Sequence, residues 1–157
     1  MERGGAARDV RLLDLPGRAS RRCGRGALTG TAILLDTHAA IWWLTDSPRL
    51  KAVARAAVAA AVDGEGVFVS SISGIEVALE DARRPMPPVE AFVEGAEASG
   101  FRVLPFDMQD AVALSELPRL HGDPFDRALA AQAQRRQLTL MTADRALLQY
   151  PIAVYRL

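Results

Sequence analysis

The sequence predicts an α/β domain of three layers, in which a central parallel sheet of four to five strands is flanked by helices. Two patterns predict it: short apolar runs alternate along the chain with longer segments whose apolar residues recur at helical spacing. Because parallel strands need crossover connections, this alternation implies right-handed strand–helix–strand units and a sheet covered on both faces. Half of the 157 residues are apolar, which is enough for one core, and we therefore expect one domain.

Each element follows from a local pattern. The apolar runs expected as strands are 32–35, 67–69, 102–105 and 138–141, with 152–155 as a candidate fifth. The helices are expected at 39–44, 47–62, 73–83, 89–99, 107–116 and 124–136. Ser47 and Pro48 form an N-cap followed by proline at the first helical position, which starts the second helix. Pro85, Pro87 and Pro88 end the third, because proline has no amide hydrogen to donate.

The first 30 residues differ from the rest of the chain. They hold seven arginines against three acidic residues and show no sustained apolar period, so we expect residues 1–30 to be a disordered arm and 31–157 to be the folded domain. Since basic and acidic residues number 19 each overall, the arm is basic and the domain acidic. One interpretation of the arm is that it contacts RNA or a partner protein. The simpler alternative is a flexible extension without a function, or a start site placed too far upstream.

Composition excludes several protein classes. The single cysteine, Cys23, cannot form an intramolecular disulfide, and no Cys/His cluster has the spacing of a zinc site, which fits a reducing, cytoplasmic setting. No apolar run reaches the roughly 20 residues of a membrane-spanning helix, so no membrane association is expected. The neutral total charge neither supports nor excludes RNA as a partner.

Acidic residues follow several of the expected strands. Asp36 ends the first strand, Glu76 lies in the first turn of the helix after the second, and Asp144 follows the fourth. Asp123 and Asp126 stand where the helix 124–136 begins. Ligands of parallel α/β sheets bind beyond the carboxyl ends of the strands, so this edge is where we expect the functional site.

These acids have both a structural and a chemical interpretation. Ser73 with Glu76 fits a capping box, Asp123 before Pro124 fits an N-cap, and Asp126 lies near the positive end of a helix. Capping does not explain why the acids converge on one edge, where like charges repel unless a cation neutralises them. Carboxylate oxygens suit Mg²⁺ or Mn²⁺. A metal that lowers the pKa of a bound water points to hydrolysis of a phosphodiester.

Four ordered segments resemble the PIN-domain ribonuclease toxins of the VapC type. The segments are 34–38 with the tryptophans that follow, 69–76, 123–127 with its Ala-Ala-Gln-Ala continuation, and 140–145. The resemblance extends from about residue 33 to the C-terminus. It implies a PIN-like fold and a Mg²⁺-dependent endoribonuclease that is held inactive by a cognate antitoxin and is usually a homodimer.

The resemblance also assigns roles to single residues. It implies four acids that bind the metal, with Mn²⁺ as an alternative to Mg²⁺, and that carry catalysis: Asp36, Glu76, Asp126 and Asp144. Asp123 matches a cap or an outer position, while Thr142 and Ser73 would orient neighbouring acids or water. The sequence departs from the family pattern at Gly74 and Ile75, where many relatives have a larger apolar residue and a tryptophan.

Other residues and other functions remain as alternatives. His38 and His121 receive no role, because neither has a nucleophile partner at a recognised spacing and a metal-activated water needs no histidine. Arg127 and Arg145 are the candidates for contacts with phosphate. A phosphatase of the haloacid dehalogenase type needs a second acid two positions after Asp36, where this chain has His38. A catalytically silent PIN relative that binds RNA or a protein is the other alternative, and the set of four acids argues against it.

Overall fold

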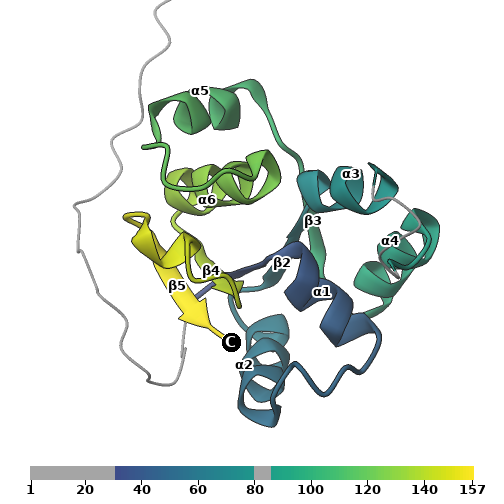
Figure 1. The fold of residues 1–157 in the computed structure, drawn as a ribbon. Coiled ribbons are helices and arrows are strands. Elements are labelled where there is room, and N and C mark those ends of the chain that lie inside the picture. Colours follow the sequence, from purple (N-terminus) through teal and green to yellow (C-terminus); the bar gives the residue numbers. More distant parts are fainter. Residues whose placement is uncertain (1–30, 80–85) are drawn as a thin grey trace, which may run out of the picture.

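The fold is built on a single sheet. A computed structural model describes residues 31–79 and 86–157. The sheet has five parallel strands in the order β3-β2-β1-β4-β5 (Figure 1). The strands are β1 (Ile33–Leu35), β2 (Val67–Ser70), β3 (Arg102–Leu104), β4 (Thr139–Thr142) and β5 (Ala153–Arg156). The predicted parallel sheet is therefore confirmed, and the candidate fifth strand is present.

Helices cover both faces of this sheet. They are α1 (Thr37–Leu44), α2 (Ala52–Asp63), α3 (Ser71–Leu79), α4 (Val89–Ala98), α5 (Met108–Glu116), α6 (Pro124–Arg136) and the 3₁₀ turn η1 (Leu147–Gln149). One apolar cluster packs α1, α2 and α4 against the sheet, and a second packs α6 and η1 against the opposite face (Figure 1). The three predicted layers are thus confirmed. The expected arm at 1–30, and the part of the third predicted helix beyond Leu79, lie outside the described residues.

The central strand shows why the strands are continuously apolar. Ile33 and Leu35 point into the first cluster, and Leu34 points into the second. Side chains alternate between the two faces of a strand, and here both faces are buried. All three residues are at most 1% exposed, so this strand has no polar side.

Three helix starts differ from the prediction by two residues or more. Helix α1 begins at Thr37, two residues before its predicted start. Helix α2 begins at Ala52 rather than after Ser47, because the Ser47 hydroxyl accepts a hydrogen bond from Arg49 N in a local turn instead of capping the helix. Helix α3 begins at Ser71, earlier than predicted, and the Ser70 hydroxyl accepts from Ile72 N. Ser73 therefore lies inside the helix.

The strand order places the expected site in the middle of the molecule. Because β1 is the central strand, Asp36 directly after it lies midway along the carboxyl edge. Its amide donates to the Met141 carbonyl of β4 at 3.1 Å, which holds the ends of the two strands together. Within the described residues, none of the helices has the length and apolar character that crossing a membrane requires.

Candidate metal centre

Asp36 joins the sheet edge to the first helix. Its side chain is the N-cap of α1 and accepts from Ala39 N, and it is also hydrogen-bonded to the Thr142 hydroxyl. The residue is only 6% exposed, and burial raises its pKa above the ordinary value although these hydrogen bonds lower it. Capping and a place at the site are therefore compatible, since one carboxylate has two oxygens and several lone pairs.

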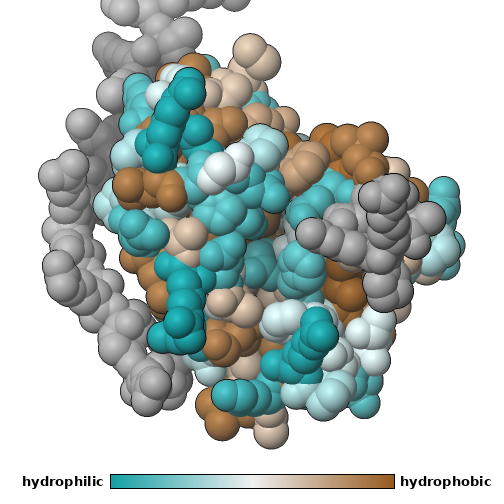
Figure 2. Space-filling model, viewed as in Figure 1, coloured by the Kyte–Doolittle hydropathy of each residue, from teal (hydrophilic) through white to brown (hydrophobic). Residues whose placement is uncertain are grey.

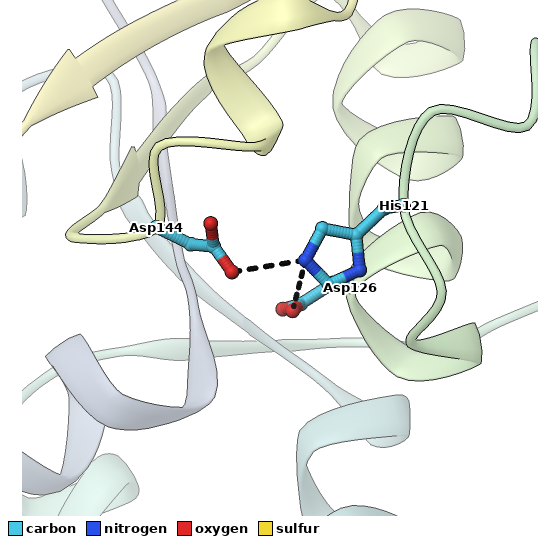
Figure 3. A group of neighbouring side chains, drawn as sticks. All are labelled: His121, Asp126 and Asp144. Atoms are coloured by element: carbon cyan, nitrogen blue, oxygen red, sulfur yellow. Dashed lines mark hydrogen bonds and ion pairs between the residues drawn. The ribbon is translucent and has the colours of Figure 1, made fainter.

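Asp126, Asp144 and His121 form a close group beside Asp36. The Nε2 atom of His121 lies 2.9 Å from Asp144 Oδ2 and 3.4 Å from Asp126 Oδ2 (Figure 3). Asp126 comes from the first turn of α6, Asp144 from the segment after β4, and His121 from the loop before α6. One ligand atom from each of the three residues lies within 4.8 Å of the others. Three segments that are separate in the sequence therefore converge on a volume suited to one ion.

Electrostatics shows an excess of negative charge at this place. Burial raises the pKa of Asp126 to about 7, with further increases from the charges of Asp123, Asp36 and Asp144. Burial also acts on Asp144, but hydrogen bonds from the Ala146 amide and the His121 ring hold its pKa below the ordinary value. The aspartates thus lie close enough to repel one another, and a cation would relieve this repulsion.

Glu76 differs from its prediction in its position within α3 and in its hydrogen-bond partner. It lies in the second turn of α3 and not the first, so the capping box with Ser73 does not form. Thr37 Oγ1 donates to Glu76 Oε2 and lies 3.0 Å from Ser73 Oγ. Since Thr37 directly follows Asp36, this hydrogen bond ties the glutamate to the residue next to the central acid. Ser73 contacts the Thr37 hydroxyl from inside the helix, and its role in orienting acids or water stays a prediction.

The residues around α6 take specific positions. Asp123 is the N-cap of α6, as predicted, and its Oδ1 accepts from Phe125 N at 2.8 Å. The Arg127 guanidinium donates to the Leu114 and Leu117 carbonyls at the end of α5. These contacts give Arg127 a role in packing, and its contact with phosphate stays a prediction. Arg145 is exposed next to Asp144 and is also still a candidate for a contact with phosphate.

Sequence reasoning missed His121. The signal available was its position, two residues before Asp123 in the loop that enters the acid-bearing helix. Only the fold shows that the ring contacts Asp144, which is 23 residues away. The donor set of aspartate oxygens with a nearby glutamate fits a hard divalent cation such as Mg²⁺.

Comparisons with known proteins agree with this fold. The PIN domain family matches residues 33–153. "Ribonuclease VapC22" from Mycobacterium tuberculosis is 33% identical in an alignment over 123 residues that covers 74% of this chain and 90% of the relative. Chains of two crystal structures, VapBC2 from Rickettsia felis and VapBC from Salmonella typhimurium, superpose with TM-scores of 0.60 and 0.59. Their sequence identities are 14% and 21%, and each match covers 80% of this chain and 98% of the solved one.

The fold and the family match together define the class of the protein. The chain belongs to the PIN-domain family, as residues 33–153 match it and the five-stranded parallel sheet is present. Within that family it is a homologue of the VapC ribonuclease toxins. The two VapBC structures support the fold.

Proposed function

We propose that this protein is an endoribonuclease that hydrolyses RNA phosphodiesters with a bound Mg²⁺ ion, as the toxin of a toxin–antitoxin pair. The relative that carries the name ribonuclease supports the activity. The observation that carries the chemistry is the convergence of Asp126 and Asp144, whose ligand atoms lie within 4.8 Å of each other, and the raised pKa of Asp126 supports it. Carboxylates this close together repel one another, and a bound cation would relieve that repulsion.

The proposed metal ligands are the four acids predicted from the sequence: Asp36, Glu76, Asp126 and Asp144. When bound, the ion would polarise the phosphate and lower the pKa of a water molecule. The chain's own residues hold the ligands in place: Thr37 orients Glu76, while the Ala39 and Ala146 amides orient Asp36 and Asp144. A nuclease of the PIN family is metal-dependent, and we propose Mg²⁺, or Mn²⁺ in its place, because the donors are carboxylate oxygens.

Cleavage assays test this function. We expect the wild-type protein to cleave RNA with Mg²⁺, to stop with EDTA, and to recover with added Mg²⁺. Asp36→Asn keeps the size and the cap acceptor of the side chain but removes its charge, and should reduce cleavage to background. Asp63→Asn, an exposed acid at the end of α2, is the matched control and should cleave like wild type. Cleavage that persists in EDTA would contradict the mechanism, and a folded protein that cleaves no RNA would favour a binding module.

The proposed partner is an antitoxin protein that covers the acids at the carboxyl edge of the sheet. Two structural relatives are VapBC complexes, and a cationic side chain such as arginine would complement the aspartates. Expression without a partner should therefore inhibit bacterial growth, while co-expression with the antitoxin, or the Asp36→Asn substitution, should relieve it. If the folded wild-type protein is harmless when expressed alone, the toxin role is wrong.

We also propose that the protein forms a homodimer. Hydrophobic side chains gather over α3 (Figure 2), where Ile75 and Leu79 are 47% and 71% exposed and lie one helical turn apart. Light scattering should give the mass of two chains, and Leu79→Glu should give the mass of one. A monomeric wild-type protein at micromolar concentration would contradict the proposal.

A further inference from the structure

His121 is the group in the acidic centre that neither the family motifs nor the proposed ligand set uses. Its backbone N donates to Tyr150 Oη at 3.1 Å, and Tyr150 is only 4% exposed. The histidine is therefore anchored through a buried residue on the segment that follows Asp144. Its side chain is 15% exposed, so the ring sits in a largely enclosed position.

The hydrogen bonds of the ring define its tautomer. Asp123 N donates to His121 Nδ1 at 2.9 Å, so Nδ1 offers its lone pair and carries no hydrogen. The ring hydrogen is then on Nε2, which points between the carboxylates of Asp144 and Asp126 (Figure 3). A backbone amide thus sets a side chain as a hydrogen-bond donor toward two acids.

The distances alone would also permit His121 to be a metal ligand, since its Nε2 belongs to the group of atoms within 4.8 Å. Ligation needs the Nε2 lone pair, which moves the hydrogen of a neutral ring to Nδ1. There it would face the Asp123 amide hydrogen across 2.9 Å, and the two donors would repel. The backbone of Asp123 therefore favours donation by Nε2 and opposes ligation.

We infer that His121 is a positioning residue that donates from Nε2 to Asp144 and Asp126, holds the two carboxylates at the separation that a metal ion needs, and does not itself bind the ion. This role rests on the proposed metal-dependent function. The two acids belong to different segments, α6 and the turn after β4, and one ring contacts both. Such outer hydrogen bonds orient ligands and typically change metal affinity about 10- to 100-fold.

Nuclear magnetic resonance tests the tautomer directly. The chain has two histidines, so His38→Gln leaves His121 as its only imidazole. Long-range ¹H–¹⁵N correlation should show a hydrogen on Nε2 in the metal-free protein, and the same pattern at saturating Mg²⁺. A hydrogen on Nδ1 in the metal-free protein, or its transfer to Nδ1 when Mg²⁺ binds, would overturn the inference.

Calorimetric titration with Mg²⁺ tests the positioning role. Counted in bonds from Cα, the amide nitrogen of glutamine matches Nε2, whereas the side-chain amide of asparagine matches Nδ1 only. We expect His121→Ala and His121→Asn to weaken Mg²⁺ binding about 10- to 100-fold and His121→Gln to restore most of it. Both polar variants keep a hydrogen-bonding group in the loop, so equal weakening in the two would indicate a general structural role and would overturn the inference.

The outcomes separate this inference from the proposed function. If wild type binds no Mg²⁺ and cleaves no RNA, the proposed function fails. If wild type binds Mg²⁺ with an affinity that His121→Ala leaves unchanged, the function stands and the positioning role is wrong. Thermal unfolding of each variant confirms that the compared proteins are folded.

Discussion

The carboxylate of Asp110 is completely buried and lies 2.6 Å from Nε of Arg135. Arg136 and Gln132 also donate to it, so three residues of α6 hold one acid of α5. Gln132 in turn accepts from the Ser70 hydroxyl at the end of β2. This network fixes α6, which carries Asp126 in its first turn, against the sheet.

Loss of Asp110 should destabilise the protein strongly. We expect Asp110→Ala to lower the free energy of unfolding by about 2 to 4 kcal/mol, because it removes the buried acceptor that Arg135, Arg136 and Gln132 share. Asp63→Ala, an exposed acid, is the control and should change it by less than about 0.5 kcal/mol. Chemical denaturation measures both; equal values would show that the network contributes nothing to stability.

The pH dependence of stability should have a component from Asp126. Its pKa is raised to about 7 in the folded protein, so between about pH 4 and pH 7 the folded state holds more protons than the unfolded state. The unfolding free energy of the metal-free protein should therefore fall as pH rises through this window, by at most about 4 kcal/mol. Asp126→Asn should flatten the slope. An unchanged slope in that variant would assign the effect to other groups.

Gly74 should tolerate a side chain. A Cβ built there meets no atom within 4 Å, and the residue lies inside α3. Gly74→Ala should stabilise the protein by about 0.5 to 1 kcal/mol, because alanine loses less backbone entropy in a helix. Gly100→Ala is the contrast: with φ at +75° and Val62 Cγ1 at 3.1 Å, it should lower the melting temperature. Destabilisation by Gly74→Ala would mean that α3 needs a flexible turn there.

Two arginines near the site should behave differently. Arg127 donates to two carbonyls at the end of α5, so Arg127→Ala should cost about 1 to 2 kcal/mol of stability.

Arg145 is exposed beside Asp144, so Arg145→Ala should leave stability unchanged. If Arg145 contacts RNA phosphate, its loss should weaken RNA binding. The slope of log binding constant against log salt concentration should then become shallower by about one. Binding measured at several salt concentrations checks this, and an unaltered salt slope would exclude the contact.

The arm at 1–30 should be dispensable for folding. Among residues 31–79 and 86–157, the strand pairing falls between Ile33 and Arg156, and the central strand starts at Ile33. We expect residues 31–157 to unfold at the melting temperature of the full chain, and circular dichroism with heating measures it. Loss of RNA binding with retained stability would assign the arm to substrate contact; a large drop in melting temperature would show that the domain boundary is wrong.

Local patterns in the sequence were sufficient for much of the fold. The continuous apolar runs around Leu34 and Leu140 predicted the buried strands, because a strand covered on both faces has no polar side. Asp123 before Pro124 predicted the start of α6, because the cap and the fixed φ of proline act within two residues. The parallel order then placed Asp36 and Asp144 at one edge. These inferences needed only short-range physics and a rule of topology.

Only the tertiary structure decided what each side chain touches. The predicted capping box of Ser73 and Glu76 does not form. Both side chains instead contact Thr37, which is 36 residues from Ser73 and 39 from Glu76 in the sequence. The contacts of His121 with Asp126 and Asp144 likewise join segments that are separate in the sequence. Hydrogen bonds between distant segments depend on how the layers pack. A local sequence pattern holds no information on which distant side chains come into contact. The sequence by itself placed Asp36 and Asp144 at the edge of the sheet, because they directly follow strands, whereas packing determined which neighbours orient them.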